Sequence, residues 1–150
     1  MPFTTQVSEY NKRFSAEKGY TPKYINNTYG CQMNEHDSET LAGMLEAMGY
    51  AKAETENDAD LILLNTCCIR EKAESKVLSH LGELKKLKKE KPWLIVGVCG
   101  CMTQQKGIVE TIKSAAPHVQ LIFGTYNMSH LPEYLADILS GETNCYNIYA

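Results

Sequence analysis

The runs Leu61-Ile62-Leu63-Leu64 and Leu94-Ile95-Val96-Gly97-Val98 decide the fold of this chain. A short continuous apolar run is typical of a strand that is buried on both faces of a sheet. Helical periodicity follows each run, over residues 70–91 and 104–115, and a proline ends each of these stretches. Their apolar positions are Ala73, Val77, Leu81, Leu84 and Leu87 in the first stretch, and Ile108, Val109 and Ile112 in the second. Such alternation of buried strands and amphipathic helices predicts a parallel sheet covered by helices.

The flanking segments extend this pattern to five strands. Shorter strands are predicted over residues 23–28, 50–53 and 119–123, and further helices over residues 34–48 and 131–140. The predicted fold class is α/β: a doubly wound, mostly parallel five-stranded sheet in three layers, flavodoxin-like or Rossmann-like, with strand order 2-1-3-4-5. The domain is placed at residues 22–141, between an N-terminal extension (1–21) with one short helical turn and a tail (142–150) without clear periodicity.

Composition narrows the class of protein. The chain has 150 residues, 43% of them hydrophobic, and a formal net charge of −3. The length fits one domain with its own core. A net charge of −3 does not indicate a basic surface for nucleic acid, so this segment is not expected to supply most of the binding affinity for an RNA. Without a membrane span or a signal peptide, we expect a cytoplasmic protein whose thiols are reduced. No glycine-rich nucleotide-binding loop is present, so the sequence does not predict dinucleotide or NTP binding.

Three cysteines stand just after three of the predicted strands, 36 and 34 residues apart. They lie in Thr28-Tyr29-Gly30-Cys31-Gln32-Met33-Asn34, in Asn65-Thr66-Cys67-Cys68-Ile69-Arg70-Glu71 and in Gly100-Cys101-Met102-Thr103-Gln104. In the predicted order these strands are adjacent, so their carboxyl ends share one edge of the sheet, over about two strand spacings of ~5 Å each. Nearby helix N-termini favour thiolates there. Three convergent thiolates can bind a soft metal ion or an iron–sulfur cluster.

Neighbouring residues suit such a site. Gly30 and Gly100 directly precede two of the cysteines, which lets the backbone turn sharply and approach a bulky ligand. Asn65, Thr66 and Gln104 are candidates for hydrogen bonds to cluster sulfurs, although ordinary loop and cap chemistry explains them equally well. Three ligands leave one coordination position open, which favours a reactive cluster over a closed zinc site.

Several alternatives stay open at this point. A zinc-binding module needs a fourth ligand; His36 is a conceivable one, but a solvent-facing position on a helix is favoured for it. A flavodoxin-like binding or signalling module, with incidental cysteines, expects a phosphate-binding loop after the first strand. Cys68 and Cys99 are interpreted as small buried or loop residues, and Cys145 as a bystander in the tail. The lysines at the end of the long helix (Lys85, Lys86, Lys88, Lys89 and Lys91) are interpreted as a solvated helix end rather than a tRNA-binding patch.

The three cysteine motifs resemble the N-terminal domain of the methylthiotransferases, which are radical-SAM enzymes. They are most similar to the MiaB branch, which makes 2-methylthio-N6-dimethylallyladenosine next to the tRNA anticodon. Phe123-Gly124-Thr125 and Asn127 also look family-like, and the resemblance covers roughly residues 22–140. It implies that Cys31, Cys67 and Cys101 are the iron ligands of an auxiliary 4Fe–4S cluster that holds or supplies the inserted sulfur.

The resemblance also implies what lies elsewhere. The chain has no C-x3-C-x2-C motif, so the second 4Fe–4S cluster, S-adenosylmethionine and the C-terminal RNA-binding domain are expected in missing domains. This fragment is therefore expected to hold no catalytic residue and to be inactive alone. The expected partners are tRNA, mainly through the missing domains, and a sulfur donor; no membrane is expected. Self-association of the fragment through apolar surface is a further expectation.

Overall fold

A computed structural model describes residues 2–29, 32–66, 71–100, 107–141 and 145–147. Its strands form one parallel sheet in the order β2-β1-β3-β4-β5-β6. The strands are β1 (Lys23–Tyr29), β2 (Ala51–Lys52), β3 (Leu61–Thr66), β4 (Ile95–Gly100), β5 (Leu121–Phe123) and β6 (Cys145–Asn147). The α-helices are α1 (Phe3–Lys18), α2 (Gln32–Ala47), α3 (Glu71–Glu90), α4 (Ile108–Ala115) and α5 (Leu131–Leu139), with 3-10 turns η1 (Glu56–Asp58) and η3 (Thr125–His130).

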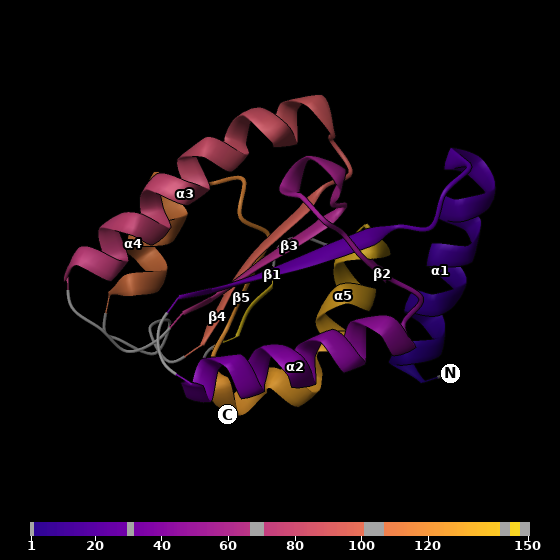
Figure 1. Ribbon diagram of the computed structural model, residues 1–150, viewed down its shortest axis with the longest axis horizontal. Helices are drawn as coiled ribbons and strands as arrows, with labels where there is room; N and C mark the ends of the chain where they lie inside the picture. Colours follow the sequence, from indigo (N-terminus) through magenta and orange to yellow (C-terminus); the bar gives the residue numbers. More distant parts are fainter. Residues whose placement is uncertain (1, 30–31, 67–70, 101–106, 142–144, 148–150) are drawn as a thin grey trace.

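The three-layer α/β fold class is confirmed (Figure 1). Every residue of β3 and β4 is buried, as the continuous apolar runs predict. Along β3 the side chains alternate between two cores because successive residues of a strand face opposite sides. Ile62 and Leu64 pack in the core beneath α3 and α4, whereas Leu61 and Leu63 pack with residues of α2 and α5. The sheet is thus covered on both faces.

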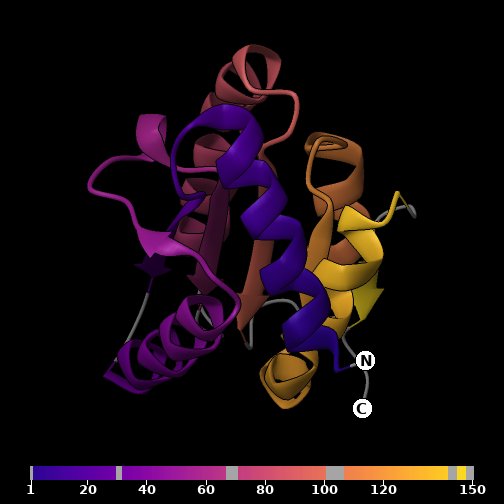
Figure 2. The same ribbon diagram turned by 90° about the vertical axis from the view of Figure 1, so that its right-hand side faces the viewer.

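Two predictions about the chain ends are wrong. The segment before β1 contains the 16-residue helix α1, not one short helical turn. Figure 2 shows α1 in front of the sheet beside α5, with which it packs. The segment after α5 contains β6, which adds a sixth strand in parallel to β5. Helix α1 and strand β6 are therefore both part of the folded domain.

The amino end of β3 is organised around the carboxylate of Asp60, which is 4% exposed. Its Oδ1 accepts hydrogen bonds from the Tyr20 hydroxyl and from Trp93 Nε1, both at 2.8 Å, and its Oδ2 accepts one from the Lys23 backbone N–H at 3.0 Å. Lys91 Nζ lies 3.8 Å from Oδ1. Burial and the neighbouring Asp60 raise the pKa of Tyr20 to about 12. One buried carboxylate thereby joins segments that precede β1, β3 and β4.

The end of α3 is fixed by lysine side chains. Lys88 Nζ donates to the carbonyl of Leu94, to that of Pro92 at 3.0 Å and to Gln120 Oε1 at 3.1 Å. Lys91 Nζ donates to the carbonyl of Ala59 at 3.0 Å. The remaining lysines of the predicted solvated helix end, Lys85, Lys86 and Lys89, are exposed. The prediction therefore holds for these three and is wrong for Lys88 and Lys91, which bind backbone carbonyls.

His118 should make the fold less stable in acid. Its ring is partly buried, with Nε2 2.6 Å from the carbonyl of Leu81, so the neutral ring donates this bond. Burial lowers the pKa of His118 below its ordinary value, so protonation favours the unfolded chain. The contribution is complete above the unfolded-state pKa of about 6.5 and is lost as the pH falls below it.

Unfolding in urea at pH 7 and at pH 5 tests this contribution. His118→Gln keeps an N–H donor for the carbonyl of Leu81 and should reduce the loss of unfolding free energy between the two pH values. His130→Gln, which changes a mostly exposed ring, is the control and should keep the wild-type loss. An equal loss in His118→Gln and wild type would contradict the assignment.

Candidate functional site

The carboxyl ends of β1, β3 and β4 form one row across the sheet. Tyr29 pairs with Thr66, and Thr66 pairs with Gly100, so the last residues of three neighbouring parallel strands stand in register. In the sequence, Cys31 follows this row by two residues, and Cys67 and Cys101 follow it by one. The three cysteines lie outside the described residues. The structure thus describes the strand ends from which each predicted ligand segment begins.

Gly100 makes the closest approach in this row. Its φ of +103° is a backbone conformation that other residues rarely adopt, and an added Cβ would lie 2.0 Å from the carbonyl oxygen of Thr66. The position therefore excludes a side chain. This agrees with the sharp turn that the sequence predicts before Cys101; Gly30, the corresponding residue before Cys31, lies outside the described residues.

The polar residues at the end of β3 bind protein atoms. Thr66 is buried, and its Oγ1 donates to the carbonyl of Cys99 at 2.8 Å, across to β4. Asn65 is also buried, and its Nδ2 donates to Ser38 Oγ at 3.0 Å. These bonds are of the loop and cap kind that one of the two interpretations expects, and hydrogen bonds from these residues to cluster sulfurs stay a prediction. Gln104, the third residue of that set, lies outside the described residues.

Ser38 joins α2 to two strands, a role that the sequence analysis missed. Its hydroxyl lies 2.7 Å from Thr28 Oγ1, and its carbonyl accepts a hydrogen bond from Asn26 Nδ2 at 3.1 Å. With Asn65, these residues form the Ser38 cluster, defined by Asn26, Thr28, Ser38 and Asn65. The signal in the sequence was the polar run Asn26-Asn27-Thr28, which is unusual for a strand with a neighbour on each side.

Two helices start near the row. α2 begins one residue after Cys31, and α3 begins four residues after Cys67. The positive end of the helix dipole favours a negative charge at such places. α4 begins at Ile108, later than predicted, because Gly107 has a left-handed φ of +81°. Residues 101–106, between Cys101 and Gly107, lie outside the described residues.

The other candidate residues are not part of this row. Cys99 is 1% exposed and packs in the core, where burial raises the pKa of its thiol. The predicted role of Cys99 as a small buried residue is thus confirmed, and its neutral thiol is a poor ligand. Cys145 lies in β6 rather than in an unstructured tail, and Cys68 lies outside the described residues. His36 is exposed on α2, as predicted.

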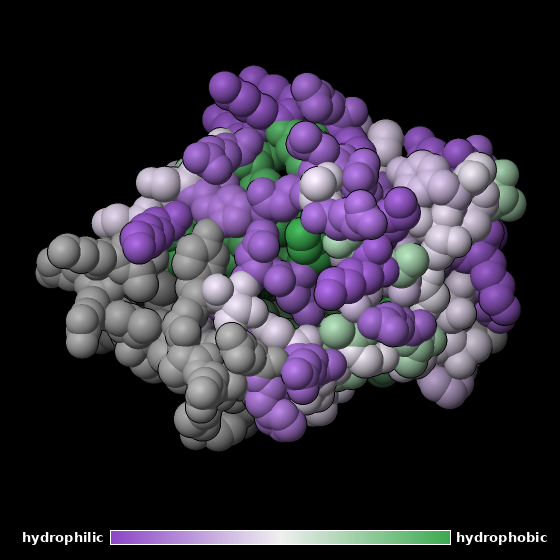
Figure 3. Space-filling model, in the orientation of Figure 1, coloured by the Kyte–Doolittle hydropathy of each residue, from purple (hydrophilic) through white to green (hydrophobic). Residues whose placement is uncertain are grey.

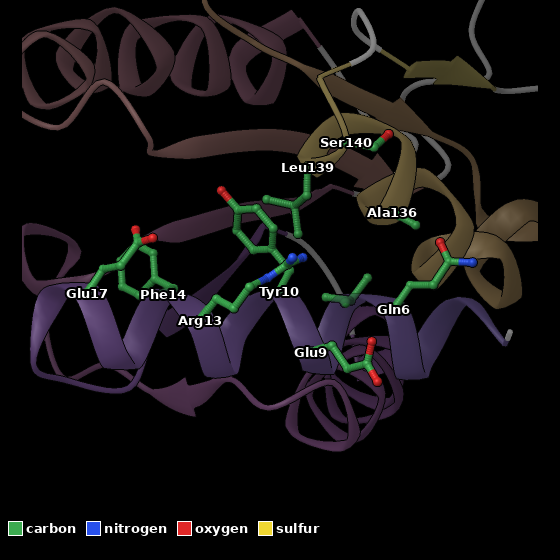
Figure 4. Close-up of a pocket in the computed structure, with 10 residues that line it drawn as sticks. Gln6, Glu9, Tyr10, Arg13, Phe14, Glu17, Ala136, Leu139 and Ser140 are labelled. Carbon is green, nitrogen blue, oxygen red and sulfur yellow. The ribbon is translucent and has the colours of Figure 1, made fainter.

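A cavity of about 550 Å³ lies away from this row, between α1 and α5 (Figure 4). Its lining combines charged side chains, such as Glu9 and Arg13, with Phe14 and Leu139. In the part of the chain that the structure describes, no group of three His, Cys, Asp or Glu side chains converges as a metal site. No described helix is both long and apolar enough to cross a bilayer. The row of strand ends therefore remains the candidate site.

Comparisons with known proteins agree on a single family. The family described as "Uncharacterized protein family UPF0004" matches residues 23–124. A protein of Acetivibrio thermocellus named tRNA-2-methylthio-N(6)-dimethylallyladenosine synthase is 50% identical over 147 residues, which is 98% of this chain and 31% of that protein. A protein of Pelotomaculum thermopropionicum with the same name is 54% identical over 127 residues, 85% of this chain and 28% of its own length.

A third relative of that name, from Staphylococcus aureus, is 48% identical over 137 residues, 88% of this chain and 27% of that protein. The matched part of the chain thus spans 27–31% of the length of these curated relatives. The match to the first of these relatives covers 98% of this chain, so it includes the segments that follow β1, β3 and β4.

Proposed function

The chain belongs to uncharacterized protein family UPF0004, the family of the methylthiotransferase N-terminal domain, and we propose that it holds the auxiliary 4Fe–4S cluster of a tRNA methylthiotransferase. The ligands in this proposal are Cys31, Cys67 and Cys101. When bound, the cluster would hold or supply the sulfur that becomes the methylthio group. This chain's own part is to bind the irons and to leave one coordination position without a cysteine.

The observation that carries the proposal is the row of Tyr29, Thr66 and Gly100. Adjacent strands are about 5 Å apart, so three strand ends in register span about 10 Å. Each continues within one or two residues into a cysteine. The glycine at Gly100, where a side chain cannot fit, suits a backbone that approaches a bulky group. Thiolates are the ligands that iron–sulfur clusters use, so the donor set fits the group.

The remaining activity is assigned to the rest of a longer protein. We propose that the second 4Fe–4S cluster, S-adenosylmethionine and most of the contact with tRNA belong to segments outside this chain, and that the chain alone does not modify tRNA. Its partners are then tRNA and a sulfur donor, in the cytoplasm. The substrate is the isopentenylated adenosine that the relatives' name specifies.

Self-association of the chain stays a prediction. Among the described residues, the large hydrophobic side chains that are exposed are Phe3 and Tyr20. Figure 3 shows a face that is mostly hydrophilic, with small hydrophobic areas between polar residues. An extended apolar patch of the kind that promotes pairing is not visible on the described part of that face.

Anaerobic reconstitution with iron and sulfide tests the proposal. We expect about four irons and four sulfides per chain, with the broad visible absorbance of a 4Fe–4S cluster. Stoichiometric zinc without an iron–sulfur chromophore would instead favour a zinc-binding module. Bound flavin without iron would favour a flavodoxin-like binding module with incidental cysteines. Either of these results would overturn the proposed function.

A further inference from the structure

The Ser38 cluster connects the two strands, β1 and β3, that Cys31 and Cys67 follow in the sequence. The Thr28–Ser38 hydrogen bond of 2.7 Å closes a segment of the chain that contains Cys31. The Asn65–Ser38 bond of 3.0 Å joins the same hydroxyl to β3, two residues before Cys67. One hydroxyl group on α2 thus contacts both strands whose ends precede these two cysteines.

A further side-chain hydrogen bond leads from the Ser38 cluster toward β4, the strand that Cys101 follows. Thr66 follows Asn65 and donates its hydroxyl proton to the carbonyl of Cys99, two residues before Cys101. Side-chain hydrogen bonds therefore run from β1 through α2 to β3, and from β3 to β4, just beneath the row of strand ends. Hydrogen bonds of this kind fix orientation more than they add net stability.

The polar side chains of the Ser38 cluster are poorly explained by their contribution to the stability of the fold alone. Asn26 Nδ2 binds the carbonyl of Ser38, while the buried Oδ1 of the same amide has no hydrogen-bond partner among the described residues. A buried acceptor without a partner loses its hydration, and this cost offsets the gain of the Nδ2 bond. Apolar residues in β1 and α2 would pack this junction without that cost. Polar residues here instead fix one relative position of β1, α2 and β3.

We propose that Ser38 is a positioning residue, which sets the distance between the ends of β1 and β3, after which Cys31 and Cys67 follow in the sequence, through its bonds to Thr28 and Asn65. The inference rests on the proposed function, since it concerns how the chain holds the iron–sulfur cluster. The side chain of Ser38 need not touch the iron–sulfur cluster. Residues that orient metal ligands typically change metal affinity by about 10–100-fold when they are mutated, even though they are not ligands.

The rate at which the reconstituted iron–sulfur cluster loses its iron to a chelator tests the role of Ser38. Ser38→Ala and Thr28→Val each remove one hydroxyl of the shared bond with little change in volume, and each should speed release at least about tenfold. The double variant should be no faster than Ser38→Ala alone, because loss of the Ser38 hydroxyl already breaks its bond to Thr28. Thr40→Ala is the matched control: it removes a hydroxyl from the same helix, where Thr40 bonds to the carbonyl of His36.

The unfolding midpoint of the cluster-free protein separates positioning from a general loss of stability. Thr28→Val, which breaks only the exposed bond between the Thr28 and Ser38 hydroxyls, and Thr40→Ala should have similar midpoints although their release rates differ. Ser38→Ala also removes the acceptor of the buried Asn65 amide and should have a lower midpoint. Release rates of Ser38→Ala and Thr28→Val within twofold of Thr40→Ala would overturn the inference, and so would rates that follow the midpoints. In that case a wild-type chain that still loads four irons leaves the proposed function intact; a wild-type chain that loads none overturns both.

Discussion

Replacement of Gly100 by alanine is expected to lower the free energy of unfolding by at least about 3 kcal/mol. The new Cβ would lie 2.0 Å from the Thr66 carbonyl oxygen and 2.8 Å from the Thr66 nitrogen, both backbone atoms of the neighbouring strand. The φ of +103° adds strain of about 1–3 kcal/mol for a residue with a side chain. Because a domain has about 5–15 kcal/mol of stability in total, a large share would be lost.

Gly43→Ala provides the control for this change. Gly43 lies in α2 with no atom within 4 Å of an added Cβ, so alanine there should stabilise the helix by about 0.5–1 kcal/mol. Urea unfolding followed by circular dichroism measures both variants. A Gly100→Ala protein that unfolds within about 1 kcal/mol of wild type would mean that β3 and β4 do not approach as described.

Replacement of Asp60 by alanine is the second large effect, at about 3–5 kcal/mol. The substitution leaves the donors of Tyr20, Trp93 and Lys23 without their acceptor, and it leaves Lys91 without the nearby carboxylate. Donors that stay buried without a partner cost more than the net value of the bonds they lose. Asp60→Asn, which keeps one acceptor oxygen, should lie between alanine and wild type.

Asp58→Ala is the matched control for Asp60. Asp58 is exposed, and its carboxylate accepts a hydrogen bond from Thr55 at 3.1 Å on the surface. Its loss should cost under about 1 kcal/mol. Thermal and urea unfolding of the three variants give the comparison. Equal midpoints for Asp58→Ala and Asp60→Ala would show that the network around Asp60 contributes no more than a surface contact.

The central sheet could be predicted because its strands carry a strong apolar signal. Leu61–Leu64 and Ile95–Val98 are buried on both faces, and the connecting helices keep regular apolar stripes. α1 lacks such a stripe, since Val7 and Asn11 are its buried residues. A hydrogen bond from Asn11 to the carbonyl of Met48 fixes this helix, and periodicity does not record such a bond. β6 is an edge strand of three residues, too short for any pattern.

The candidate site also has one part that could be predicted from the sequence and one part that could not. The row formed by Tyr29, Thr66 and Gly100 follows from the strand order, so the sequence was sufficient to predict it. The Ser38 cluster depends on contacts between polar residues on three separate elements, and single polar residues in a sequence do not specify their partners. Thr66 illustrates the difference: its position was predicted, whereas its bond to Cys99 required the structure.

The most direct test of cluster binding by this chain is the iron content of six single cysteine variants after anaerobic reconstitution. Alanine at Cys31, Cys67 or Cys101 should remove most of the bound iron. Alanine at Cys68, Cys99 or Cys145 should leave about four irons per chain, as in wild type. Equal iron loss in the two sets of variants would contradict the assignment of the three ligands that follow β1, β3 and β4.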